Sequence, residues 1–215
     1  MTFDTATEDY REHAMATASQ VTPSARGDDT RRALLDAAHD LLATEGPGSL
    51  TVRRIATAAG MSTMNVYSRF GGKDGVLDEL FIDGFRRLGE LMAESPATDD
   101  PREDLRRCKH TYRRFARENA TYYSLMFDRV VPDFVPSDRA EGVALETLRQ
   151  LQWRIERAMS AGVIREGDSF AVATALWSCV HGLVSLEART EGKLVDFDWD
   201  TVFDMATDAL VRGLG

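Results

Sequence analysis

The stretch TVRRIATAAGMSTMNVYSRFGGK, residues 51–73, predicts two short helices joined by a tight turn. Thr51 can act as the N-cap of the first helix, because its hydroxyl can accept a hydrogen bond from a free first-turn amide. Gly60 can end this helix, because glycine adopts the left-handed conformation of a helix end without a Cβ clash. Ser62 or Thr63 can then cap the second helix. The apolar residues of the first helix recur at helical spacing: Ile55, Ala56 and Ala59.

The second helix of this stretch divides into a buried side and an exposed side. The small residues at positions 56 and 59 let the two helices cross steeply at close range, and larger apolar residues fill the wedge beside them: Met61, Val66 and Phe70. The remaining side chains face outward: Thr63, Met64, Asn65, Ser68 and Arg69. This is the layout of a helix-turn-helix that reads the DNA major groove, although similar turns also join helices that never contact DNA.

Helices are predicted on both sides of this pair. The upstream helix takes Thr30 as its N-cap, ends at residues 46–48 (GPG), and keeps apolar residues at helical spacing: Leu34, Leu35, Ala38, Leu41 and Leu42. The downstream helix opens at Lys73 and Asp74 and carries its own apolar face: Val76, Leu77, Leu80, Phe81 and Leu88. Three helices packed in this way form a small domain whose third helix can enter a groove.

The rest of the chain predicts further helices, so we expect an all-α fold. After the helix of residues 74–94, a helix is expected to start at Pro101, and a short helix after it to end at Phe127. The next helix is expected to be capped by Ser137 or Asp138 and to end at Gly162. Two last helices are expected near residues 169–188 and 200–214. The inner face of the helix that ends before Gly162 is expected to hold Leu145, Leu148, Leu151, Ile155, Ala158 and Met159.

The chain divides into three predicted parts: a disordered arm (1–27), a helix-turn-helix DNA-binding domain (28–73) and a larger helical domain for ligand binding and dimerisation (74–215). The arm has too few large apolar residues to offset the entropy of ordering it. The helix near 169–188 is apolar on too many sides for the surface of a monomer. We therefore expect the last two helices to pair with those of a second copy in a four-helix interface.

A helix followed by GPGSLTV, IA..AG, NVYSRF and GKDGVLDEL resembles the N-terminal domain of the tetracycline-repressor-like (TetR) family of bacterial transcriptional regulators, over roughly residues 29–82. The run ALWSCVHGLVSLE, with Trp177, His181 and Gly182, resembles the W..vHGl signature of one C-terminal subfamily, the WHG subfamily, and ENATYYSLMF resembles the short helix before its pocket. The resemblance implies an all-helical homodimeric repressor whose C-terminal domain binds a small molecule.

The same resemblance assigns DNA-contacting positions. Those that would approach base edges are Arg53, Thr63, Met64, Asn65, Ser68 and Arg69, while Tyr67 and Lys73 would hold phosphates, and Thr51 completes the predicted DNA-binding set. Plain chemistry agrees, because Arg reads guanine, Asn reads adenine, and methyl-bearing Met or Thr can touch a thymine methyl. Where the family commonly has a small residue followed by Thr, this chain has Met64 and Asn65, so its operator sequence is expected to differ.

The charge distribution indicates which partners the protein can bind, and the cysteine content indicates its cellular compartment. The chain of 215 residues has a net charge of −9, but residues 26–73 hold seven basic against five acidic residues, so an acidic body carries a mildly basic module. Two cysteines in no metal or disulfide spacing suit a reducing cytosol. The sequence shows neither a secretion signal nor an uninterrupted apolar span, so we expect a cytoplasmic protein without a membrane segment.

A ligand pocket in the body is expected to draw on large soft side chains: Tyr112, Phe115, Met126, Phe127, Trp153, Trp177 and His181. Each of these is, taken singly, more often an ordinary core residue. The GGK of residues 71–73 lacks two required residues of a phosphate-binding loop, no nucleophile elbow occurs, and the four histidines are scattered. We therefore expect no catalytic site, no cofactor and no metal site.

Two functions remain open at this point. The first is a homodimeric transcriptional repressor that binds a palindromic operator on double-stranded DNA and is released by a small-molecule effector. The second is a helical small-molecule-binding protein or enzyme in which the helix-turn-helix is only structural.

Overall fold

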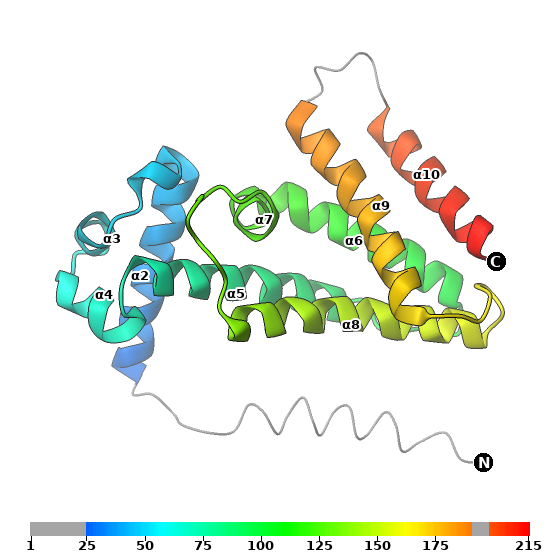
Figure 1. Ribbon diagram of the computed structural model, residues 1–215, viewed down its shortest axis with the longest axis horizontal. Helices are drawn as coiled ribbons and strands as arrows, with labels where there is room; N and C mark the ends of the chain where they lie inside the picture. Colours follow the sequence, from blue (N-terminus) through cyan, green and yellow to red (C-terminus); the bar gives the residue numbers. More distant parts are fainter. Residues whose placement is uncertain (1–24, 191–197) are drawn as a thin grey trace.

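The computed structural model describes residues 25–190 and 198–215, and all of the regular structure in these residues is helical, as predicted. The helices, labelled as in Figure 1, are α2 (Ala25–Glu45), the 3₁₀ turn η1 (Pro47–Ser49), α3 (Val52–Ala58), α4 (Thr63–Phe70), α5 (Lys73–Ala93), α6 (Pro101–Glu118), α7 (Ala120–Phe127), α8 (Asp138–Ser160), α9 (Ser169–Thr190) and α10 (Trp199–Leu214). In Figure 1, α2, α3 and α4 cluster at one end of α5, and α6 to α10 gather around its other part.

Local caps explain most of these boundaries. The side chain of Asp100 accepts hydrogen bonds from the amides of Arg102 and Glu103, and Pro101 occupies the first turn of α6. At the start of α8, the Ser137 hydroxyl accepts from the Ala140 amide over 3.2 Å. The starts predicted at Pro101 and after Ser137 are therefore confirmed.

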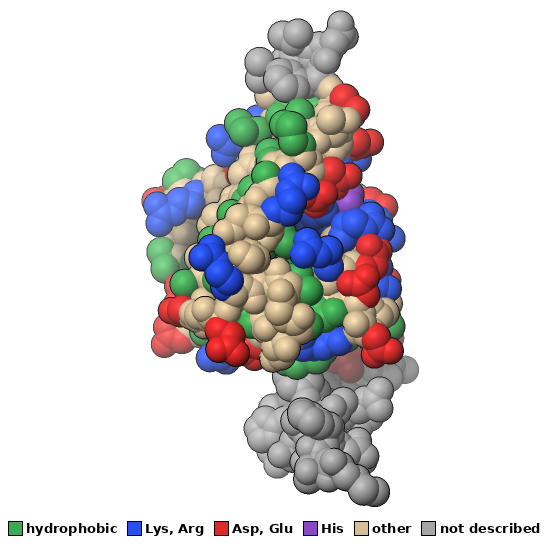
Figure 2. All heavy atoms as spheres, turned by 90° about the vertical axis from the view of Figure 1, so that its right-hand side faces the viewer, with side chains coloured by type: hydrophobic (Ala, Val, Ile, Leu, Met, Phe, Trp, Pro, Cys, Tyr) green, Lys and Arg blue, Asp and Glu red, His purple; other side chains and the backbone are tan. Residues whose placement is uncertain are grey.

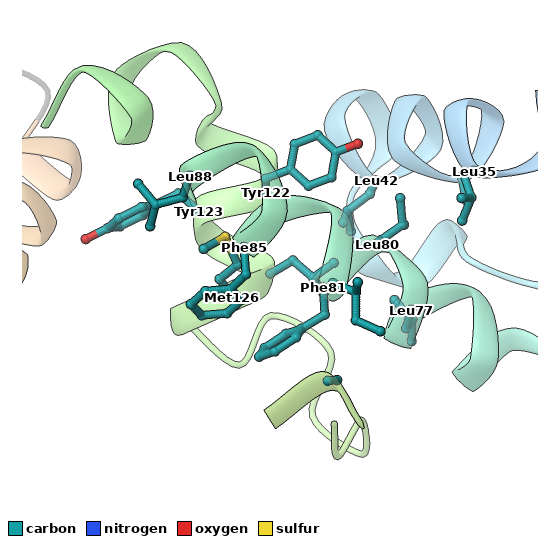
Figure 3. Close-up of a cluster of buried hydrophobic side chains, with 14 of the residues drawn as sticks. Leu35, Leu42, Leu77, Leu80, Phe81, Phe85, Leu88, Tyr122, Tyr123 and Met126 are labelled. Carbon is teal, nitrogen blue, oxygen red and sulfur yellow. The ribbon is translucent and has the colours of Figure 1, made fainter. Parts of the chain in front are cut away.

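The core of the molecule is built around α5. Leu77, Leu80 and Phe81 are at most 7% exposed, and they pack with buried leucines of α2 on one side. Farther along α5, Phe85 and Leu88 meet side chains of α7, and Figure 3 shows both groups in one continuous cluster. Helix α5 begins at Lys73, next to the predicted division between residues 73 and 74, and it packs against both α2 and α8.

Three expectations are corrected by the structure. Helix α2 begins at Ala25, so Thr30 lies inside the helix and not at its N-cap. The last three residues of the predicted arm therefore belong to a helix, and the others, 1–24, lie outside the described residues. Leu145, expected on the inner face of α8, is 39% exposed and borders a cavity instead of packing in the core.

Helix α9 is apolar on most sides, but much of its surface is not buried by other helices. Of its residues only Ala173, Leu176, Val180 and Val184 are buried. Phe170 and Leu186 are 41% and 55% exposed. Within the described residues α9 is the one helix long and apolar enough to cross a membrane, a criterion that helices of soluble proteins also meet.

Candidate nucleic-acid interface and ligand cavity

The turn between α3 and α4 is set by capping groups and by glycine. Thr51 Oγ1 accepts a hydrogen bond from the Arg54 amide over 3.2 Å, which confirms the predicted N-cap of α3. Gly60 has a φ of 66°, a left-handed conformation that lets the chain leave α3 and enter α4 within a few residues. Ser62 occupies the N-cap position of α4, but its hydroxyl accepts from the Asn65 side chain and not from the backbone.

The position of α4 is set by its packing against α3 and by a close contact with the first turn of α5. Val66 is fully buried, and Ile55 and Ala56 of α3 are at most 2% exposed beside it. At the other end of α4, a Cβ added to Gly75 in the first turn of α5 would collide with the Phe70 carbonyl. Only glycine permits this close approach of the first turn of α5 to the end of α4.

The opposite side of α4 is open to solvent. Met64 and Tyr67 are 70% and 55% exposed, large values for apolar and aromatic side chains in a structured helix. Ser68 and Arg69 are also exposed, while Asn65 is half-buried. The Asn65 Oδ1 accepts from Arg69 Nη1 over 3.0 Å, so these two predicted base readers orient each other. Of the side chains predicted to face outward from α4, Thr63, Met64, Ser68 and Arg69 are exposed, and Asn65 is only partly so.

The charges near α4 separate into paired and unpaired groups. Three arginines form ion pairs within the domain or with α5: Arg31 with Glu79, Arg32 with Asp36, and Arg54 with Glu45. Among residues 25–190 and 198–215, Arg53, Arg69 and Lys73 have no acidic partner within ion-pair distance. These three cations without an acidic partner are among the residues predicted to contact DNA.

Tyr67 and the first turn of α5 lie together at the edge of this face. A Cβ on Gly72 would be 3.9 Å from the Tyr67 ring, and Gly72 provides no side-chain cap for α5. The amides of that turn and the ammonium of Lys73 can therefore receive a phosphate, as helix starts commonly do. The structure therefore brings Tyr67 and Lys73, the two predicted phosphate contacts, to one edge of the exposed face of α4.

A cavity of about 660 Å³ lies in the body of the protein. Its walls are mainly apolar and come from α5, α6, α8, α9 and α10, with one residue of α7. Of the predicted pocket residues, Tyr112, Phe127 and Trp177 line it. The other four lie elsewhere: Phe115 and Met126 in the core, Trp153 on the outer side of α8, and His181 behind Tyr112.

His181 belongs to a buried polar network and not to the cavity wall. The hydroxyl oxygens of Tyr112 and Tyr123 lie 3.1 and 2.7 Å from its Nδ1, and Trp177 Nε1 donates to the Tyr112 hydroxyl over 3.2 Å. Burial lowers the pKa of His181, which keeps the imidazole neutral near pH 7, and burial raises the pKa of Tyr112 well above its ordinary value. The tryptophan and histidine of the WHG-like segment thus order the wall of the cavity.

The cavity residues that the sequence did not predict come mostly from α8 and α6, and fewer come from α10, α5 and α9. They include Phe85, Leu88, Met92, Thr147, Leu148, Gln150, Leu151 and Arg154. Helical spacing marks most of these as inward-facing, but it does not distinguish a side chain that fills the core from one that borders a void. No composition signal identifies them.

Helix α7 borders the cavity and also packs against α2. Phe127, at its end, lines the cavity, while the Tyr122 ring stacks on His39 of α2 with ring centres 4.7 Å apart. The Tyr122 hydroxyl donates to Asp83 Oδ2 of α5 over 2.7 Å, and Arg87 donates to the same oxygen over 2.9 Å. In Figure 3, Tyr122 and Tyr123 leave α7 on opposite sides, toward α2 and away from it.

Comparison with known proteins gives a consistent result over most of the chain. A profile described as "Bacterial regulatory proteins, tetR family" matches residues 34–80, and one described as "Tetracyclin repressor-like, C-terminal domain" matches residues 105–210. The chain is 27% identical over 214 residues to the HTH-type transcriptional regulator Rv1816 of Mycobacterium tuberculosis, covering 86% of this chain and 88% of the relative.

Solved structures agree in fold. A protein from Rhodococcus sp. RHA1 has a TM-score of 0.75 at 26% identity, with 86% of this chain and 95% of that one covered. PfmR, a TetR family transcriptional regulator from Thermus thermophilus, has a TM-score of 0.64 at 23% identity, with 85% and 98% covered. The likeness therefore includes both the α2–α4 cluster and the helical body.

Proposed function

Since the chain belongs to the tetR family of bacterial transcriptional regulators, which are DNA-binding proteins and not enzymes, we propose that it is a homodimeric repressor of a palindromic operator. In this proposal a small molecule in the body releases the protein from DNA. Membership of this family excludes the alternative of an enzyme in which the helix-turn-helix is only structural. As a soluble regulator of transcription, the protein is proposed to act in the cytoplasm.

The observation that carries the proposal is the contrast between the two sides of α4. One side buries Val66 completely, and the other exposes Met64, Tyr67 and Arg69 without a covering element in the described residues. Met64, Tyr67 and Arg69 are exposed together on one side of a single helix, which is the arrangement that a groove-reading helix requires. The major groove offers thymine methyl groups to Met64 and guanine acceptors to Arg69.

The remaining predicted contacts fit the same docking. We assign Arg53, Thr63, Asn65 and Ser68 to base edges, and Thr51, Tyr67 and Lys73 to the backbone at the groove rim. These assignments are supported by the exposure of most of these side chains, with Asn65 and Lys73 half-buried, and by the lack of an acidic partner for Arg53 and Lys73 in the described residues. The Trp177 to Gly182 segment further supports placement of the C-terminal domain in the WHG subfamily.

Dimerisation through α9 and α10 is supported by exposed apolar side chains on both helices. Leu186 of α9 and Met205 of α10 are 55% and 61% exposed. Figure 2 shows the face toward which α10 lies, where apolar side chains are exposed among charged ones. A two-fold interface on these helices would bury them and present two copies of α4 to successive major grooves, about 34–36 Å apart.

Ligand release is supported by the two contacts of α7. A ligand against Phe127 that shifts α7 must also disturb the stack of Tyr122 on His39, because both residues belong to one short helix. A coupling of about 1–3 kcal/mol between the cavity and the DNA-binding helices would weaken operator binding about 5- to 150-fold.

The proposal is tested by selecting bound fragments from a random duplex library with the purified protein. A palindrome with half-site centres one helical turn apart is expected. The Met64→Ala/Arg69→Ala protein should recover no such site, and Arg149→Ala, an exposed arginine on α8, serves as the matched control. Recovery of unrelated sequences by the wild-type protein would refute the proposal.

A further inference from the structure

The cavity has an apolar interior and a basic mouth. We infer that its ligand is an elongated amphipathic carboxylate, whose apolar chain lies inside and whose anionic group lies between the start of α6 and the end of α10. This inference rests on the proposed ligand-binding role of the cavity and specifies the chemistry of that ligand.

The interior of the cavity favours a chain without polar groups. On the α6 and α9 walls, the polar atoms of Tyr112 and Trp177 are already bonded to each other, and His181 lies behind them. On α8, the Thr147 hydroxyl donates to the Val143 carbonyl. Apart from Gln150 of α8 and Thr207 of α10, whose hydroxyl donates to the Phe203 carbonyl, the interior is bordered mainly by apolar side chains: Phe85, Leu88, Met92, Leu105, Phe127, Leu148, Leu151, Leu176 and Val180.

The shape of the cavity favours an extended molecule. The lining residues of α6 run from Arg102 to Tyr112, and those of α8 run from Ala144 to Arg154. At about 1.5 Å per helical residue, each wall is about 15 Å long. A volume of about 660 Å³ spread over this length suits a flexible chain better than a compact ring system.

The cavity lining holds more cationic than acidic side chains. They comprise five cations, Arg102, Arg106, Lys109, Arg154 and Arg212, against three acids, Asp100, Glu103 and Asp208. The lining is therefore net positive in a chain whose net charge is −9. This excess of cations over acids, in low-dielectric walls, favours anionic ligands over cationic ones.

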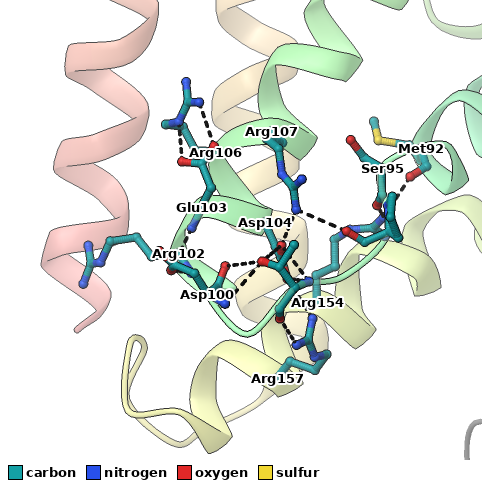
Figure 4. A network of polar contacts seen from close by, with 12 residues as sticks. Met92, Ser95, Asp100, Arg102, Glu103, Asp104, Arg106, Arg107, Arg154 and Arg157 are labelled. Carbon is teal, nitrogen blue, oxygen red and sulfur yellow. Dashed lines mark hydrogen bonds and ion pairs between the residues drawn. The ribbon is translucent and has the colours of Figure 1, made fainter.

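Two of these cations are available to an anion at the mouth. Arg106 donates to both oxygens of Glu103 over 2.7 Å, and Lys109 pairs with Asp208 at 2.7 Å, so these charges are neutralised. Arg102 and Arg212 are exposed and have no acidic partner in the described part of the chain. Figure 4 shows Arg102 extending from the start of α6 toward α10, the helix that carries Arg212.

A third cation adds to the field inside. The buried guanidinium of Arg154 donates to the carbonyls of Met92 and Ser95 over 2.9 and 3.2 Å, at the end of α5. These carbonyls fix its position but carry no full negative charge. A guanidinium fork matches a carboxylate better than a neutral head group, and a cationic head group would be repelled.

The inference is tested by isothermal titration calorimetry without DNA, using four probes: decanoate, decanol, decylamine and acetate. We expect decanoate to bind about tenfold more tightly than decanol, and decylamine and acetate not to bind measurably. The Arg102→Ala/Arg212→Ala protein should bind decanoate about tenfold more weakly and decanol unchanged. Arg114→Ala, an exposed arginine of α6 outside the cavity, should behave as wild type.

The site of binding is tested by Leu148→Trp, which fills the cavity from a half-buried position and should abolish binding of both decanoate and decanol. Equal affinity for decanoate and decanol, no effect of the double arginine variant, or undiminished decanoate binding by folded Leu148→Trp would each overturn the inference. Because no DNA is present, these outcomes do not depend on whether the protein binds an operator.

Discussion

Asp104 lies at the start of α6 and is the centre of a polar network that holds the turn between α5 and α6 (Figure 4). Its carboxylate accepts from the Thr98 hydroxyl over 2.8 Å, from Arg107 over 2.6 Å and from Arg157 over 2.8 Å. Burial alone would raise the pKa of Asp104, but the hydrogen bonds from Thr98 and the two arginines outweigh it and lower the pKa from 3.8 to about 2.

This lowered pKa stabilises the fold by about 2.5 kcal/mol at neutral pH, at about 1.4 kcal/mol per pKa unit. Because folding lowers the pKa, the contribution is complete above pH 5 and is lost as the pH falls through 4 toward 2. Asp104→Asn is therefore expected to reduce the free energy of unfolding by about 2–3 kcal/mol at pH 7 and by about 1 kcal/mol less at pH 3.

The measurement is urea unfolding followed by circular dichroism at fixed protein concentration, since the stability of the proposed dimer would depend on concentration. Glu103→Gln is the matched control, because it removes the neighbouring carboxylate from an exposed ion pair with Arg106 and should leave the urea midpoint unchanged. A difference between wild type and Asp104→Asn that is equal at pH 7 and pH 3 would refute the reasoning.

Three further predictions concern function. Arg69→Ala should relax base choice by about 1–3 kcal/mol at one operator position, measured by fluorescence anisotropy on single-base variants, and uniform weakening on all of them would contradict a base contact. Lys73→Ala should weaken binding to all duplexes alike and reduce the slope of log K against log salt by about 1, whereas an unchanged slope would exclude a phosphate contact. Leu186→Asp should convert the dimer to a monomer in sedimentation experiments, because it buries an unpaired charge in the interface, and a stable dimer would place the interface elsewhere.

The helix-turn-helix could be predicted closely because its signals are local. Thr51 caps α3 through its own hydroxyl, and Gly60 supplies the left-handed turn, so neither feature needs tertiary information. The start of α2 could not be predicted in the same way. Several residues before Thr30 can begin a helix, and the structure selects Ala25.

The cavity wall was predictable only in part, because it depends on how each helix is rotated in the assembled body. Met126 and Phe127 are adjacent in α7, yet Met126 is buried in the core and Phe127 borders the void. Trp153 has the same chemical character as Trp177, but the rotation of α8 leaves it outside, where the guanidinium of Arg157 lies over its ring. Residue type cannot distinguish these cases.

The positions of the cavity mouth and of α7 relate the length of the ligand to a displacement of the DNA-binding helices. An anion held by Arg102 and Arg212 fixes one end of the ligand, so a longer apolar chain must extend farther along the cavity toward Phe127. A ligand shifts an equilibrium only through contacts that differ between two states. A carboxylate too short to reach Phe127 would therefore bind without disturbing Tyr122, His39 or α4, and the release of DNA would depend on chain length more steeply than binding does.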